Sequence, residues 1–226
     1  MTVVIVRNKL DYDDCHSKGR PMSPRQSDAR QRVVAAAAEM LARHGLNATS
    51  IRELAKRAEA PLGSTYHHFP GGKQQVVVEA VNSAGARVSA GLEHHLQAGA
   101  VAGLRGFLAM WREILLRSEF RVGCPVMAVA VEEPIDETAV AALDAAAQVF
   151  GDWEDKLVAA LEAQGRDRES ASRLAILVLA GTEGAVVLCR ACKSITPFDA
   201  VAEQLERIVS GEGDGRPGPA ASRRAG

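Results

Sequence analysis

Apolar residues recur at intervals of three and four along most of the chain, which is the spacing of one face of an α-helix. In the segment 28–44, for example, Val33, Ala37, Met40 and Leu41 form such a stripe, and Gly45 follows as a helix-ending residue. The pattern predicts an all-α protein without strands or internal repeats. Further helices are predicted at 73–96, 101–118, 126–132, 135–164, 167–193 and from 196 onward.

One stretch, 49–73, breaks this run of longer helices into two short ones. Ser50 can cap the first of them, since Glu53 stands three residues later and completes a capping box. The chain then turns, and Pro61 suits the first turn of a second helix because its missing N–H needs no partner there. Two short helices joined by a tight turn form a helix-turn-helix.

The side chains of this stretch suit contact with DNA. Small residues let a helix sit deep in a major groove, and hydroxyl, histidine and lysine groups can donate to phosphates. Thr49 and Ser50 lie at a helix N-terminus, where the hydroxyl, the backbone N–H groups and the helix dipole together favour a phosphate. The other candidate DNA-binding residues are Pro61, Leu62, Gly63 and Ser64 in the first turn of the second helix, followed by Tyr66, His67 and Lys73.

Charge is unevenly distributed along the chain, although the net charge is only −1. The segment 23–75 has eight Lys/Arg against four Asp/Glu, a net of +4. The segment 76–210 has twelve against nineteen, a net of −7. The basic part coincides with the helix-turn-helix, where phosphate contacts need positive charge, and the acidic part is expected to project away from DNA.

The run GSTYHHFPGGK, from Gly63 to Lys73, resembles the DNA-binding signature of the TetR family of transcriptional repressors. Its ending, together with a Gly-Cys-Pro segment at 123–125 and a Glu-Gly-Ala run at 183–185, is similar to the LmrA/YxaF-like subgroup of lincomycin-resistance repressors. The resemblance implies that Tyr66 and His67 contact the DNA backbone and that Lys73 anchors a phosphate. Pro61 and Leu62 stand where many relatives have Ser and Lys, so the operator does not follow from generic members.

The acidic part is the expected effector-binding region. Large apolar side chains in its helices are expected to surround a cavity for a small, mostly apolar ligand, and a few polar groups would orient it. The alternative is that these side chains are ordinary core. The candidate ligand-binding residues are Phe107, Met110, Trp111, Met127, Phe150, Trp153 and Glu183, with Thr182 and Arg112 as further polar candidates.

A homodimer on a palindromic operator is expected, because one recognition helix reads too few base pairs. The last two helices are the predicted interface, through Gly181, Ala185 and the stripe of Val201, Leu205 and Ile208. Ligand would favour a body conformation in which the linking helix, 73–96, moves the two heads out of register with the half-sites. No catalytic constellation emerges, and the sequence predicts neither an enzyme nor a cofactor.

Two other readings compete with this one. Cys189 and Cys192 are three residues apart on one helix and could form a redox pair or hold a metal, although a zinc site wants four ligands. Unchanged release from DNA by oxidant or metal in a double Cys→Ser variant would remove that possibility. The second alternative is a DNA-binding protein with no small ligand, which a body lacking a cavity would favour.

The predicted layout is an arm without order (1–24), a DNA-binding domain (25–72), a ligand-binding and dimerisation domain (73–210) and a second segment without order (211–226). Met22 is a second candidate start of translation, which N-terminal mass spectrometry of the natively expressed protein would decide. Few aromatic residues, four irregularly spaced cysteines and no continuous apolar run of eighteen residues suit a soluble cytoplasmic protein that does not engage a membrane.

Overall fold

The computed structural model describes residues 24–211, which form nine α-helices and contain no strand. The prediction of an all-α fold is confirmed. The predicted segments without order lie outside these residues, apart from Pro24 and Gly211. The helices are α1 (Pro24–His44), α2 (Ile51–Arg57), α3 (Leu62–His68), α4 (Gly72–Leu96), α5 (Ala100–Arg117), α6 (Pro125–Ala130), α7 (Glu137–Ala163), α8 (Arg168–Cys192) and α9 (Thr196–Ser210).

The helix ends follow local capping rules, with one correction to the sequence prediction. Ser50 caps α2 as expected, and its hydroxyl accepts a hydrogen bond from the backbone N–H of Glu53 at 3.3 Å. Pro61 is the N-cap of α3 and not its first helical residue, because its ψ of 134° is extended. In α9, Ile195 is the N-cap and Pro197 lies in the first turn.

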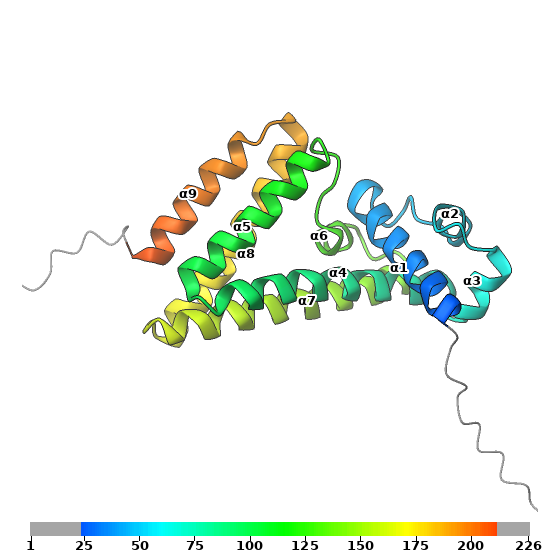
Figure 1. Ribbon diagram of the computed structural model, residues 1–226, viewed down its shortest axis with the longest axis horizontal. Coiled ribbons are helices and arrows are strands. Elements are labelled where there is room, and N and C mark those ends of the chain that lie inside the picture. Colours follow the sequence, from blue (N-terminus) through cyan, green and yellow to red (C-terminus); the bar gives the residue numbers. More distant parts are fainter. Residues whose placement is uncertain (1–23, 212–226) are drawn as a thin grey trace, which may run out of the picture.

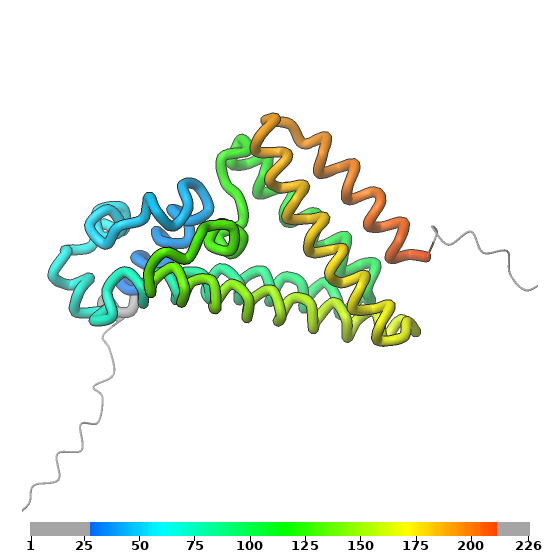
Figure 2. Tube along the Cα trace, turned by 180° about the vertical axis from the view of Figure 1, so that it is seen from behind, coloured from blue at the N-terminus to red at the C-terminus, as the bar shows by residue number. Residues whose placement is uncertain are grey.

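Helices α1 to α3 form a small head at one end of the molecule, and α4 continues from it into the body (Figure 1). There α4 lies alongside α7 over much of its length, and α5, α8 and α9 rise from the far end (Figures 1 and 2). The buried apolar residues of head and body form one cluster, from Val33 in α1 to Val209 in α9. A movement of α4 therefore cannot leave the packing of the head unchanged.

Gly85 allows α4 and α7 to approach closely. A Cβ at this position would lie 2.5 Å from both terminal methyl carbons of Val149. The backbone carbonyl of Gly85 also accepts a hydrogen bond from the indole Nε1 of Trp153, at 3.2 Å. This glycine is thus a packing residue and not a flexible joint in the helix.

We expect Gly85→Ala to lower the free energy of unfolding by about 1–3 kcal/mol, because the new methyl group must displace Val149. Urea unfolding followed by circular dichroism measures this. Gly91→Ala is the matched control on the same helix, since its Cβ would meet only the sulfur of Met110, at 3.7 Å. Alanine's higher helix propensity should make that control neutral or slightly stabilising. Equal losses in both variants would contradict the close-packing explanation.

Helix α8 is long and apolar enough, by length and composition alone, to cross a membrane. In the structure it packs between α7 and α9 and buries Thr182 and Glu183 in the protein interior. Core helices of globular proteins share this composition. The apolar character of α8 is accounted for by its packing within the body and by the exposed face described below.

Candidate nucleic-acid interface

Helix α3 has one buried face, which fixes it against the rest of the head. Thr65 and Phe69 are buried, and the hydroxyl of Thr65 donates to the backbone carbonyl of Pro61 at 3.2 Å. The guanidinium carbon of Arg30 in α1 lies 5.1 Å from the ring centroid of Phe69. His68 is half-buried. Phe69 and, in part, His68 therefore pack against the head.

The opposite face of α3 is open. Tyr66 is 54% exposed and Leu62 is 37% exposed, and a Cβ added at Gly63 would meet no atom within 4 Å. Pro61 and His67 are also exposed, and Ser64 is half-buried. The predicted residues of the first turn therefore lie on one accessible surface together with Tyr66 and His67. No other segment covers Gly63.

Ser50 and Thr49 differ in their accessibility. Ser50 is exposed at the N-terminus of α2. Thr49 is buried, and its hydroxyl donates to the backbone carbonyl of Gly45 at 3.0 Å. A buried hydroxyl in that position cannot reach a phosphate, so the structure does not support Thr49 as a DNA contact. It orders the loop between α1 and α2 instead.

Lys73 lies in the first turn of α4 and is half-buried. Within residues 24–211 it belongs to no ion pair shorter than 4.0 Å, so its ammonium group is available to another anion. Exposed Arg52 and Lys56 of α2 are further basic side chains of the head that residue-by-residue reasoning missed. The positive net charge of the segment 23–75 was the only sequence feature that pointed to these two residues.

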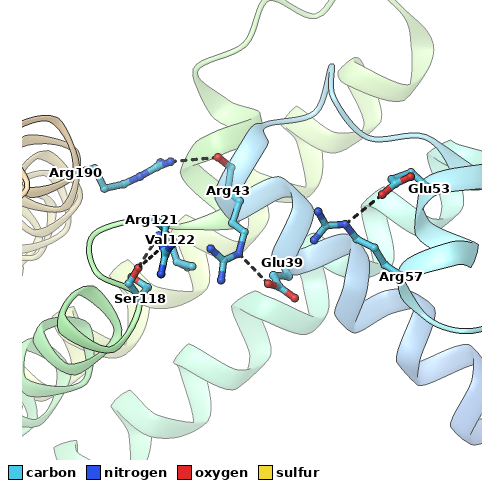
Figure 3. A network of polar contacts seen from close by, with 8 residues as sticks. All are labelled: Glu39, Arg43, Glu53, Arg57, Ser118, Arg121, Val122 and Arg190. Carbon is cyan, nitrogen blue, oxygen red and sulfur yellow. Dashed lines mark hydrogen bonds and ion pairs between the residues drawn. The ribbon is translucent and has the colours of Figure 1, made fainter.

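The body holds the C-terminal end of α1 through backbone groups. The N–H of Gly123, in the segment between α5 and α6, donates to the carbonyl of Ala42 at 2.9 Å. The guanidinium of Arg190, near the end of α8, donates to the carbonyl of Arg43 at 3.3 Å (Figure 3). These contacts satisfy carbonyls that the last turn of a helix leaves without intrahelical partners.

Glu132 makes a further contact between the body and the backbone of the head near the end of α1. Its carboxylate accepts from the backbone N–H of Leu46 at 2.5 Å and of Asn47 at 3.2 Å, just beyond α1. Sequence reasoning missed Glu132, because an acid after a short apolar helix has no feature that separates it from a surface residue. We call the contacts of Gly123, Arg190 and Glu132 with the end of α1 the junction latch.

The predicted ligand-binding residues do not surround one cavity. Phe107 is buried in the core, and Met127 is half-buried in α6. Trp153 is buried, bonded to Gly85, and stacked edge-on against half-buried Phe150 with ring centroids 5.5 Å apart. Met110 and Trp111 instead line a crevice between head and body. Arg112 lies away from this crevice: it is exposed, forms a two-point ion pair with Asp199 at 2.8 and 3.2 Å, and lines a separate groove between α5 and α9.

Glu183 is buried in α8 beside the thiol of Cys124, the N-cap of α6. Burial raises the pKa of Glu183 to about 7, and hydrogen bonding to Cys124 opposes this only in part. Burial also raises the pKa of the Cys124 thiol well above 9.0, and the nearby Glu183 adds to the effect. Among the described residues, one oxygen of Glu183 (Oε2) and the hydroxyl of Thr182 are buried without a hydrogen-bond partner.

The two cysteines near the end of α8 do not face the same environment. Cys189 is buried and Cys192 is exposed, and both are free thiols. Burial raises the pKa of Cys189, which lowers its thiolate fraction and its reactivity. Residues 24–211 contain no group of three or more His, Cys, Asp or Glu side chains placed to hold a metal.

Most of the predicted interface residues of the last two helices pack within the chain. A Cβ at Gly181 would lie 3.4 Å from side-chain carbons of Val201 and Leu205, and Ala185 is buried. Leu205 is only 3% exposed, so these residues join α8 to α9 inside one chain, whereas Ile208 of the same predicted interface is 40% exposed. The accessible apolar face of α8, which we call the α8 face, is formed by Ile176, Leu177, Ala180, Val187, Leu188 and Ala191 around Gly184.

The comparisons with known proteins agree with this arrangement. Residues 33–80 match "Bacterial regulatory proteins, tetR family", and residues 100–204 match "Transcriptional regulator LmrA/YxaF-like, C-terminal domain". The chain is 36% identical over 186 residues to the HTH-type transcriptional regulator Rv0196 of Mycobacterium tuberculosis, covering 81% of this chain and 95% of the relative. It is 27% identical to the HTH-type transcriptional regulator LmrA of Bacillus subtilis, covering 76% and 91%.

Solved structures share the fold. A TetR transcriptional regulator from Legionella pneumophila superposes with a TM-score of 0.72 at 22% identity, over 79% of this chain and 96% of that one. A TetR-family regulator from Agrobacterium tumefaciens gives 0.66 at 26% identity, over 80% and 97%. With the exposed face of α3 at the end of a basic head, these matches establish that the chain belongs to the TetR family of DNA-binding transcriptional regulators, with a body of the LmrA/YxaF-like type.

Proposed function

We propose that this protein is a homodimeric repressor that binds a palindromic operator and leaves it when a small, mostly apolar ligand binds. The observation that carries the DNA-binding part is the exposed face of α3, on which Leu62, Gly63, Ser64, Tyr66 and His67 stand opposite buried Thr65 and Phe69. The first-turn residues, with Pro61, would reach base edges. Tyr66, His67, Ser50 and Lys73 would hold phosphates on either side.

A second copy of the chain is the proposed occupant of the α8 face. Large apolar side chains there are about half exposed, and the face extends along α8 from Ile176 to Ala191. Monomeric proteins rarely leave such a continuous apolar stripe in water. Pairing two copies about a two-fold axis would cover it and place two α3 helices on successive turns of one face of DNA, as a palindrome requires.

Release by ligand would act through the connection between body and head. The head is joined to the body by the continuous helix α4 and by the junction latch at the end of α1. A ligand that favours a different body packing would therefore change the angle of the head, and in a dimer the spacing of the two α3 helices. Such a regulator works in the cytoplasm, where it meets DNA.

Lys73→Gln tests the DNA-binding proposal. The change removes one positive charge per protomer at the start of α4 and leaves an uncharged polar side chain in its place. For a dimer we expect operator affinity to fall about thirtyfold and the slope of log K against log salt to become shallower by about 2, since two phosphate contacts are lost. Fluorescence anisotropy on DNA from upstream of the protein's own gene, between about 50 and 200 mM salt, measures both quantities.

Lys156→Gln is the matched control for this experiment. Lys156 lies in α7, far along the body, where its ammonium group is 3.7 Å from the carboxylate of Glu93. Its replacement should leave affinity and salt slope unchanged. If Lys73→Gln behaves like this control on every fragment that wild type binds, the head does not contact DNA in the proposed way.

A further inference from the structure

A crevice lies between head and body, separate from the body's interior core. Its walls come from α1, α4 and α5, and it is also lined by Val122 and Gly123 of the segment between α5 and α6 and by Pro125 at the start of α6. Its volume is about 400 Å³, within the range of about 300–1,000 Å³ that is usual for small-molecule sites. Both the head and the body contribute walls, so any molecule held here contacts the two at once.

The two long walls differ in the size of their side chains. The α1 wall presents alanines, among them Ala35 and Ala38, and the α5 wall presents Met110, Trp111 and Ile114. Small residues facing large apolar ones leave a narrow space that suits a flat ring or an extended alkyl chain. The indole N–H of Trp111 is buried and has no hydrogen-bond partner in the described part of the chain.

The charged groups at the crevice favour a negative ligand. Arg87 of α4 is exposed, and its hydrogen bond to the hydroxyl of Ser83 spans 3.5 Å. Over residues 24–211 no carboxylate lies within 4.0 Å of its guanidinium. The acid of the same lining, Glu39, is already paired with Arg43 at 2.8 Å (Figure 3). Arg87 is therefore the charged residue of this lining that has no ion-pair partner among the described residues.

We propose that the crevice binds a small amphipathic carboxylic acid, with its apolar part between the α1 alanines and the α5 side chains and its carboxylate on Arg87. This rests on the proposed ligand-responsive function and names its site and ligand class. Arginine's planar group matches a carboxylate with two parallel hydrogen bonds. The arrangement also excludes a neutral molecule of the same shape from the strongest polar contact.

Occupation of the crevice acts on the junction latch. Gly123 lines the crevice and also donates to the carbonyl of Ala42, which belongs to the opposite wall. An acid that separates α1 from α5 strains this hydrogen bond and its neighbour from Arg190 to Arg43. The ligand thus favours a head orientation different from the one in the structure, which couples binding to release from DNA.

Calorimetric titration with defined acids tests the proposal. The probes are 1-naphthoate and decanoate, each compared with its neutral counterpart, 1-naphthamide or decanol. Wild type should bind the acids about fivefold more tightly than the neutral compounds at low salt, as for a partly exposed ion pair. Arg87→Gln should remove this preference, and Ala35→Leu, which fills the crevice from an exposed position, should weaken acid and neutral compound alike at least tenfold.

Arg117→Gln is the matched control, since Arg117 is an exposed arginine of α5 that pairs with Glu113 away from the crevice. It should bind the acids as wild type does. Acids that do not bind, or that bind equally well to the Arg87→Gln and Ala35→Leu variants, would overturn the site. Acid binding that leaves operator affinity unchanged would overturn the coupling to the latch. DNA binding and dimerisation are measured without acid, so the proposed function stands or falls separately.

Discussion

A negative charge on the α8 face is expected to split the dimer. In Leu188→Glu the carboxylate replaces a leucine that is 55% exposed in the single chain, so the protomer should still fold. In a dimer the same carboxylate would be buried without a partner, at a cost of about 3–4 kcal/mol. We expect the dimer dissociation constant to rise at least a hundredfold, as measured by sedimentation velocity over a range of concentrations. Operator affinity should fall by a similar factor, because one head contacts only one half-site.

Leu116→Glu provides the comparison for this variant. Leu116 is also an exposed leucine, 43% accessible, but it lies on α5 outside the α8 face. The same substitution there should leave both association and DNA binding unchanged. A Leu188→Glu protein that sediments as wild type does would show that the two copies meet elsewhere.

A charge at Leu205, a residue of the interface predicted from the sequence, does not test where the two copies meet. Leu205 is buried against Gly181 inside one protomer. Leu205→Arg would therefore disrupt the packing of α9 on α8, and a loss of dimers would follow from local unfolding alone. The structure moves the test from the buried contact between α8 and α9 to the exposed side of α8.

The head could be predicted closely from the sequence because its rules are local. Three residues close together in the sequence mark its helix ends. Gly45, with a φ of 79°, follows α1, Ser50 caps α2, and Pro61 precedes α3. Where the prediction failed, a neighbour decided. Thr49 carries a hydroxyl at a helix N-terminus, but this hydroxyl donates a hydrogen bond to the backbone carbonyl of Gly45, and the residue is buried within the head.

The body was less predictable because its contacts join residues far apart in sequence. Helical spacing identified the apolar residues of α8, but it cannot say which of two apolar sides meets α9 and which stays exposed. Gly181 was predicted to face a second copy, but in the structure it packs against Val201 and Leu205 of the same chain. Arg112 and Glu132 have partners 87 and 86 residues away, Asp199 and Leu46, which no local pattern indicates.

Glu183 is expected to make the protein less stable as the pH rises from about 4.5 to about 7. The pKa of an unfolded glutamate is near 4.5, whereas burial raises that of Glu183 to about 7 in the folded protein. Between these values the folded state holds a proton that the unfolded state has released. The free energy of unfolding therefore falls by about 1.4 kcal/mol per pH unit, or about 3 kcal/mol in total, and the loss is complete above pH 7.

Glu183→Gln should remove this dependence, because an amide fills the same space without a charge to desolvate. At pH 8 we expect the variant to be about 3 kcal/mol more stable than wild type, and at pH 4.5 about equally stable. Urea unfolding at both pH values, at one fixed protein concentration because of the dimer, measures the difference. The control is Glu203→Gln, which makes the same substitution at an exposed position of α9.

The same comparison decides whether burial of the Glu183 carboxylate destabilises the folded protein. If Glu183→Gln gains nothing at pH 8, the carboxylate is stabilised in the folded protein, and its burial has no cost. A gain of the expected size means that the body keeps a costly acid in its core. Since folding does not favour such a group, its retention would point to a role in ligand response, for which operator release by ligand in the glutamine variant is the direct measurement.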